Sequence, residues 1–138
     1  MKTKEEIIRL LRTDVQGWNK WRVENPDAQI DLSYADLGGA NLSGVNLAKA
    51  NMYLANFRRA DLSYANLSES NMVKAVIVDA YLGYADMSGA LLICAVLTGS
   101  NLYGADLRRA DLTHAYLTCA NFSGSDLRDA CLANANLV

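Results

Sequence analysis

The 138-residue sequence is poor in several features on which common protein classes depend. It contains a single proline, Pro26, which argues against a disordered chain. Its formal net charge is only −2, and the region after residue 30 carries ten acidic against seven basic residues. A charge balance this weak does not favour nucleic acid as a direct partner. Hydrophobic residues make up 51% of the chain, which is enough for a core.

Cysteines and long apolar runs are also scarce. The three cysteines, Cys94, Cys119 and Cys131, form no CxxC pair, which favours free thiols in a reducing compartment over a disulfide framework. No apolar run approaches the ~20 residues that cross a bilayer. The N-terminal residues MKTKEEIIRLLR carry charges throughout, unlike a signal peptide. We therefore expect a cytoplasmic protein that does not bind membranes.

What the sequence does contain is a five-residue rule that runs from residue 30 to residue 138. Every fifth position from Leu32 to Leu137, 22 in all, is Leu, Met, Phe or Ile. Two residues before each lies a small residue, which is Ala at 17 of the 21 positions from Ala35 to Ala135. The position between the two, which we call the Asx slot, is Asp or Asn in 16 of 22 units. A fixed period of this kind predicts a repeat architecture.

A period of five excludes a plain helix or strand, because neither the helical period of about 3.6 nor the strand period of two keeps the large apolar residue on one side. A path that turns a corner every five residues does so, with Leu and Ala pointing inward. Six glycines fall two residues after the large apolar position, where a turn uses their conformational freedom. These are Gly39, Gly44, Gly89, Gly99, Gly104 and Gly124. Asp and Asn in the Asx slot are expected to bond nearby backbone amides.

Segments such as ANLSG, ADLRRADL and ANFSGSDL resemble the A(D/N)LxX pattern of the pentapeptide repeat family. The resemblance covers residues 31–138 and implies an all-β solenoid, a right-handed quadrilateral β-helix of about five coils with four pentapeptides each. We expect one structural domain in two parts, a helical cap over residues 1–29 and the β-helix over residues 30–138. The segment from Leu11 to Pro26 also resembles the one before the repeats in many cyanobacterial members.

The N-terminal residues predict the cap that a solenoid needs at an open end. Thr3 and Glu6 have the spacing of a capping box, and Gly17 is expected to divide the helical region into two short helices. Five apolar residues share one helical face: Ile7, Leu10, Leu11, Val15 and Trp18. Trp18 and Trp21 are large enough to cover the first coil. The alternative is that these tryptophans form a ligand or partner site.

At the other end the repeat continues to Leu137 and Val138 with no helix after it. Either the last coil is exposed or a second copy covers it, since an end-to-end contact hides both cores. Some members of the family are similar in pairing through their C-termini. We therefore expect a homodimer through the C-terminal end, which we define as Leu132, Leu137 and Val138.

Residues suited to catalysis or metal binding are few. His114 is the only histidine and falls in an outward corner slot, where a solvated side chain is the favoured interpretation. Cys94 lies one coil before it in the same column, but two ligands without nearby carboxylates make a poor zinc site. No glycine-rich nucleotide-binding motif occurs. We predict no catalytic residues, no cofactor and no metal.

The best functional lead is the set of Asx slots that hold neither Asp nor Asn. With four units per coil, every fourth unit stacks, so Val76, Val96 and Tyr116 form one outward column. We define the apolar stripe as this column, the adjoining one and two close neighbours: Tyr53, Val73, Val76, Val78, Leu91, Ile93, Val96 and Tyr116. Leu54 is expected to lie close by. Contiguous exposed apolar surface predicts a partner-binding site. The alternatives are that β-branched residues merely suit strand geometry, or that the cap or a neighbour covers them.

A basic patch of Arg108, Arg109 and Arg128 lies among four aspartates, which favours a solvated salt-bridge surface. We favour a non-enzymatic structural and protein-interaction module, a rigid scaffold whose protein partner the sequence does not name. The alternative from the resemblance is a DNA-mimicking, gyrase-interacting protein, although the acids here are offset by bases and no long loop interrupts the coils. An enzyme is least favoured, because no insertion is present to wall a pocket.

Overall fold

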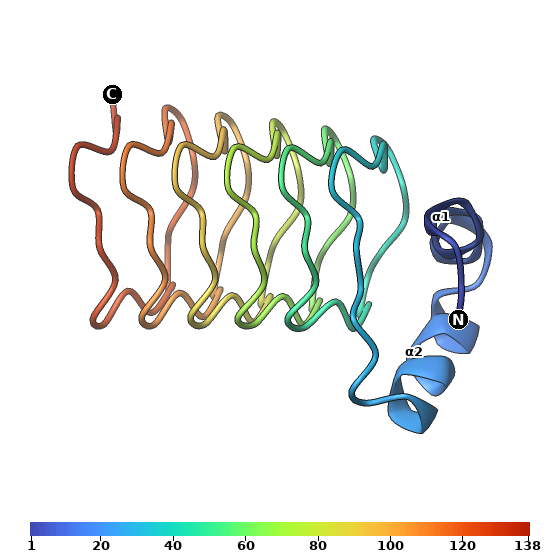
Figure 1. The fold of residues 1–138 in the computed structure, drawn as a ribbon. Coiled ribbons are helices and arrows are strands. Elements are labelled where there is room, and N and C mark those ends of the chain that lie inside the picture. Colours follow the sequence, from blue (N-terminus) through green and yellow to red (C-terminus); the bar gives the residue numbers. More distant parts are fainter.

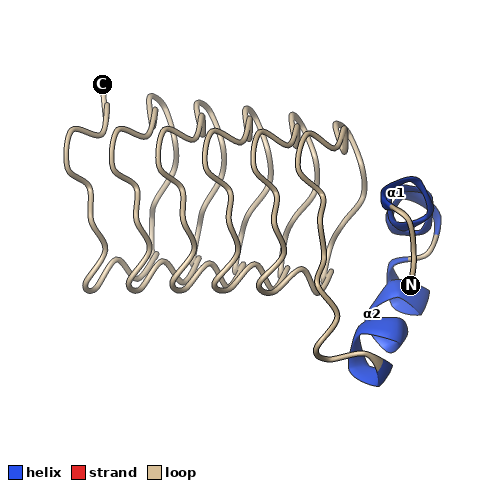
Figure 2. Cartoon of the chain, in the orientation of Figure 1, coloured by secondary structure: helices blue, strands red, loops and turns tan.

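The computed structural model describes residues 1–138, and in it the repeats form a solenoid with two helices at one end (Figure 1). Helix α1 spans Lys4–Thr13 and helix α2 spans Val15–Glu24. From there the chain winds away from the helices in stacked coils and ends at the opposite end of the column. No segment forms a continuous strand, so the coils are drawn as loops throughout (Figure 2).

Single-residue parallel bridges set the register between coils. Each bridge joins an Asx slot to the Asx slot four units later, from Asp31 with Asn51 to Tyr116 with Asn136. Four pentapeptides therefore make one coil, and each Asx slot is the centre of one face. Each face is extended, as expected, but only its Asx-slot residue forms a β-bridge to the neighbouring coil.

The corner of every pentapeptide has left-handed backbone geometry. All 21 corner positions from Tyr34 to Asn134 have φ between 55° and 72°, yet only six are glycine. The left-handed region costs an L-residue of order 1–2 kcal/mol. Each corner is held by hydrogen bonds: the Ala35 amide donates to the Leu32 carbonyl at 3.0 Å, and the Tyr34 amide donates to the next coil at 2.8 Å. The stacked coils thus impose a conformation that most of these side chains do not prefer alone.

The large apolar residues form one continuous core along the axis. Those from Leu32 to Leu112 are all fully buried, and they belong to a single cluster of 37 buried hydrophobic residues. Three serines replace alanine in the small inward slot without leaving an unpaired hydroxyl, and the half-buried Ser125 donates to the Phe122 carbonyl at 2.6 Å. Ser70 donates to the Leu67 carbonyl at 2.7 Å, and Ser100 donates to the Leu97 carbonyl at 2.6 Å.

Two helices form, but the prediction that Gly17 divides them is wrong. The capping box at the start of α1 is present, and Asp14 is the C-cap that follows its last residue, Thr13. Asp14 then caps α2, because its Oδ1 accepts a hydrogen bond from the Gly17 amide at 2.8 Å. Gly17 lies in the first turn of α2, and a β-carbon there would collide with the Asp14 carboxylate. The break therefore depends on the capping carboxylate, and the glycine makes room for it.

The helices cover the first coil, as a cap does. Ile7, Leu11 and Trp18 are buried in the same cluster as the coils. The Trp18 indole donates to the Asn46 carbonyl at 2.8 Å and stacks on Trp21 with ring centroids 5.3 Å apart. Each helix has ten residues, and neither is long and apolar enough to cross a bilayer.

Candidate interaction surfaces

Every Asp and Asn in an Asx slot makes the same local hydrogen bond. In all 16 units the side-chain oxygen accepts from the backbone amide two residues later, as Asp31 does from Ser33 at 3.0 Å. The other six slots lack this bond. They hold Val76, Tyr81, Leu91, Val96, Tyr116 and Cys131. These six side chains therefore do not stabilise the turn by the hydrogen bond that Asp and Asn make in the other units.

Six residues of the apolar stripe occupy one column of these slots and the corner before it, while Leu91 lies in the adjacent column of slots and Val78 in the following corner. Bridges join Val76 to Val96 and Val96 to Tyr116, so the three lie one above another. Leu91 is 42% exposed and Tyr116 is 50% exposed, whereas the other six residues of the stripe are half-buried. All eight keep surface open to solvent, so the cap does not cover them. That the stripe binds a partner stays a prediction.

The apolar surface extends further toward the cap than the stripe as defined. Tyr34, which is exposed, lies edge-on against the Tyr53 ring with centroids 5.7 Å apart and planes at 83°. Leu54, which is also exposed, lies at the same corner one coil later. The sequence did not predict Tyr34 as part of this surface, because Tyr34 lies one residue after the column of Tyr53, Val73 and Ile93. The available signal was its separation of 20 residues, one coil, from the apolar Leu54, which follows Tyr53 directly in the sequence.

Three tyrosines form an exposed ladder on a different corner. Tyr64 and Tyr84 stack with centroids 5.4 Å apart, as residues one coil apart are expected to, and Tyr103 packs edge-on against Tyr84 at 5.6 Å. The Tyr84 ring lies over Gly104, where a β-carbon would come within 2.7 Å of it. Loss of solvent around the packed rings raises the pKa of the Tyr84 hydroxyl, and Tyr103 adds to this shift.

The arginine patch is made of local ion pairs. Arg108 pairs with Asp106 and Arg128 pairs with Asp126, each at 2.6 Å, and Arg108 also approaches Asp126 at 3.8 Å. Hydrogen bonding from Arg128 lowers the pKa of Asp126 to about 2. Arg109 makes no ion pair. Of the four surrounding aspartates, only Asp106 and Asp126 form ion pairs with the arginines. The patch is solvated and nearly neutral, which suits neither a nucleic-acid surface nor a strongly acidic one.

The C-terminal end differs from the rest of the column because its core is open. Leu132 is 36% exposed, Leu137 is 59% exposed and Val138 is almost fully exposed. The backbone edge is open too, since the amides of Phe122, Leu127, Leu132 and Leu137 have no partner within the chain. The corresponding amide one coil earlier, that of Leu117, donates to the Asn136 carbonyl at 2.7 Å.

The two residues considered for metal binding lie at successive corners of one column. Cys94 is half-buried and His114 is exposed. No three or more His, Cys, Asp or Glu side chains gather in a way that suits a metal ion. All three cysteines are free.

Solved structures share the repeat. The pentapeptide repeat protein alr5209 from Nostoc PCC 7120 is 30% identical over 90% of this chain and 95% of its own, with a TM-score of 0.63. HetL, a pentapeptide repeat protein involved in heterocyst differentiation regulation in Nostoc sp. strain PCC 7120, is 29% identical over 77% of this chain, with a TM-score of 0.35. This chain spans 63% of the length of HetL.

QnrB1, a plasmid-mediated fluoroquinolone resistance protein, is 26% identical over 78% of this chain and 60% of its own, with a TM-score of 0.36. No curated protein sequence matches significantly. The sequence profile of the family described as Pentapeptide repeats matches in overlapping segments from residue 28 to residue 138, with eight copies. The family's fold is a right-handed β-helix, which agrees with the four-unit coils. This chain therefore belongs to the pentapeptide repeat family.

Proposed function

We propose that this protein is a non-enzymatic interaction module, a rigid β-helix that binds a protein partner through the apolar stripe. One observation carries the proposal: Val76, Val96 and Tyr116 form a continuous outward column in slots where Asp or Asn would bond the turn. In these slots the side chains lack the turn hydrogen bond that an asparagine makes elsewhere in the repeat. Their contribution is a solvent-facing apolar surface, which is typical of a binding site.

The shape of the stripe also favours a protein partner. Its residues sit on a regular surface rather than in a cavity, and none of them lines a pocket. Small molecules prefer concave sites, whereas flat apolar surfaces with aromatic residues are typical of protein interfaces. Tyr34, Tyr53 and Tyr116 supply such aromatic residues at the two ends of the surface.

The test uses substitutions that restore the repeat rather than damage it. Val76→Asn with Ile93→Ser removes two central apolar side chains, and the new Asn regains the turn bond. We expect the double variant to melt at or near the temperature of the unaltered protein and to lose a partner captured from host extract. The matched control is Tyr81→Asn, the same change in a slot on another face. If the same partners bind all three proteins equally, the stripe is not the interface.

We further propose that a second copy covers the C-terminal end. The open ring of Leu132 and Leu137, with unpaired amides beside it, supports this arrangement. A two-fold contact places each surface against its own equivalent, so apolar groups meet apolar groups. Light scattering should give a dimer for the unaltered chain and a monomer for Leu132→Lys with Leu137→Lys. Tyr103→Lys is the control, and a monomer at all micromolar concentrations for the unaltered chain would remove the proposal.

The gyrase alternative has less support. Asp106 and Asp126 are each neutralised by an arginine, so this part of the surface lacks the continuous negative charge of a DNA mimic. A DNA supercoiling assay, with and without quinolone, tests this alternative: no effect at high protein concentration excludes an interaction with gyrase.

The three free thiols support the cytoplasm as the protein's compartment.

A further inference from the structure

The edge of the first coil has backbone groups that no earlier coil can pair. Inside the column, an Asx-slot residue uses both its amide and its carbonyl toward the preceding coil. The Asn51 amide donates to the Ile30 carbonyl at 2.8 Å, and the Asn51 carbonyl accepts from Leu32 at 2.7 Å. The carbonyl two residues later, that of Tyr53, accepts from Tyr34 at 2.8 Å. Each face of the first coil therefore presents three such groups to the cap.

On the face at residues 46–48 the cap pairs all three. The Trp18 indole and the Arg22 guanidinium donate to the carbonyls of Asn46 and Ala48 at 2.8 and 3.0 Å. The Asn46 amide donates to the Asn19 side-chain carbonyl at 2.8 Å. These side chains act as a substitute for the missing coil.

Two other faces are paired in part. Arg12 donates to the carbonyls of Asp36 and Gly38 at 3.1 and 3.2 Å, and Lys4 donates to the Ser33 carbonyl at 2.7 Å. The fourth face, Asn41–Ser43, is the exception. The Asn41 amide, the Asn41 carbonyl and the Ser43 carbonyl have no partner within the chain.

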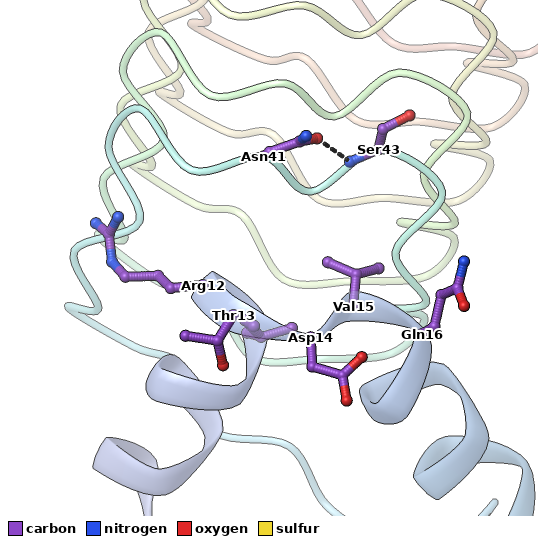
Figure 3. Close-up of a pocket in the computed structure, with 8 residues that line it drawn as sticks. Arg12, Thr13, Asp14, Val15, Gln16, Asn41 and Ser43 are labelled. Atoms are coloured by element: carbon purple, nitrogen blue, oxygen red, sulfur yellow. Dashed lines mark hydrogen bonds between the residues drawn. The ribbon is translucent and has the colours of Figure 1, made fainter.

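A groove of about 440 Å³ lies against this unpaired face. Its other wall is the junction between α1 and α2, residues 11–16. Val15 points from the junction toward the Asn41–Ser43 segment, while Thr13 and Asp14 point away from it (Figure 3). The cap thus stands off from the coil at the one face that it leaves without any hydrogen bond.

We propose that this groove binds a short extended peptide segment of a partner protein, which adds to the first coil as a parallel strand. The peptide would accept a hydrogen bond from the Asn41 amide and donate to the carbonyls of Asn41 and Ser43. That is the pattern by which each coil pairs with the one before it, and strand addition of this kind is a recurrent mode of peptide recognition. The parallel direction follows from the bridges, which are parallel throughout.

The groove also selects the side chains of the peptide. Residues that face inward meet Val15, which is half-buried and packs against the core that contains the fully buried Leu11. Because cap side chains already pack over the core of the first coil, the inward positions of the peptide take small side chains such as Ala, Ser or Gly. The site is separate from the apolar stripe, so the two proposals fail or succeed independently.

The probe is the acetylated and amidated peptide Ala-Ser-Ala-Asn-Ala, titrated into the ¹⁵N-labelled full chain. We expect shifts of the Asn41 amide and of residues 11–16, with a Kd on the order of 1 mM or tighter. The control is the same peptide methylated on its backbone nitrogens, which cannot donate to the two carbonyls. Equal shifts with both peptides, no shift at Asn41, or shifts confined to the open edge near Leu132 would overturn the proposal.

A pair of variants places the site. Ser43→Trp puts a bulky side chain at the mouth of the groove, whereas Ser123→Trp makes the same change in the equivalent slot of the last coils. Both serines are exposed, and the backbone amide of each donates to the Asn two residues before it. We expect Ser43→Trp to weaken peptide binding at least tenfold and Ser123→Trp to leave it unchanged. Unaltered binding in Ser43→Trp places the peptide elsewhere and overturns the proposal.

Discussion

The two ends of the column are built from the same pentapeptides but differ in whether helices cover them. Leu37 and Leu137 belong to one ladder, and the first is fully buried while the second is 59% exposed. The difference comes from the non-repeating N-terminal segment, which places Trp18 and two helices over the first coil. The repeat therefore supplies length and core, whereas closure of an end must come from some other chain segment.

Removing the centre of the cap should make the first end resemble the second. Trp18→Ala deletes a fully buried ring and its hydrogen bond to Asn46, so we expect a loss of about 3–5 kcal/mol in unfolding free energy. Denaturant titration measures it. Trp21→Ala, in a half-buried position, is the comparison and should cost clearly less. Equal losses would show that Trp18 does not carry the closure.

The same ladder tests how far the ends differ energetically. We expect Leu37→Ala to cost about 2–5 kcal/mol, because it leaves a cavity beneath the cap. Leu137→Ala should cost well under half of that in a monomeric sample, since much of this side chain already meets solvent. Thermal unfolding of both variants gives the ratio. A similar cost at both positions in the monomeric sample would contradict the comparison, whereas a rise in the cost of Leu137→Ala in a dimeric sample would mean that a second copy covers the last coil.

A smaller effect tests the backbone edge alone. Asn19 donates to the Gly44 carbonyl at 2.9 Å and accepts from the Asn46 amide at 2.8 Å, so it pairs two groups of the first coil. We expect Asn19→Ala to cost about 1–2 kcal/mol, since the part-buried amide loses its only partner. Faster hydrogen exchange at Asn46 is the direct measurement. Exchange at Asn41 should already be fast and should not change.

The smallest effect concerns the last coils and depends on pH. The pKa of Asp126 is about 2 in the folded chain, below its ordinary value of ~3.9. The ionised carboxylate thus favours the fold above about pH 4, and this contribution is lost as the pH falls through about 2. Arg128→Ala should raise the pKa of Asp126 in a ¹³C titration of the carboxyl group. Arg109→Ala is the control and should leave it unchanged.

The coil itself could be predicted from the spacing of side chains. Alternation of Leu and Ala places the core, and residues one coil apart such as Tyr64 and Tyr84 do stack. The spacing is informative because each unit repeats the same local hydrogen bonds, so one unit predicts the others. The family resemblance added the hand and the four-sided section, which the period alone does not determine.

The cap was less predictable because its contacts are not repeated. Gly17 suggested a break between the two helices, but the break lies at Asp14. The Asp14 carboxylate accepts the hydrogen bond of the Gly17 amide, which a continuous helix would use for its own backbone. The groove beside Asn41 depends on the angle at which the helices leave the coil, and no local pattern encodes that angle. The left-handed backbone at non-glycine corners such as Arg59 was also not predicted, because only glycine in a sequence signals a positive φ.

The constant step of four pentapeptides between bridged positions has a consequence for how such a chain can change in length. After the deletion of one pentapeptide, every face would still have a large apolar residue, a small inward residue and a corner, so the core would tolerate the change. The outside would not, because every later residue would rotate by one face and Val96 would no longer follow Val76. A loss of four consecutive pentapeptides would restore both. Insertions and deletions should therefore be nearly silent to folding yet destructive to recognition, unless they come in whole coils.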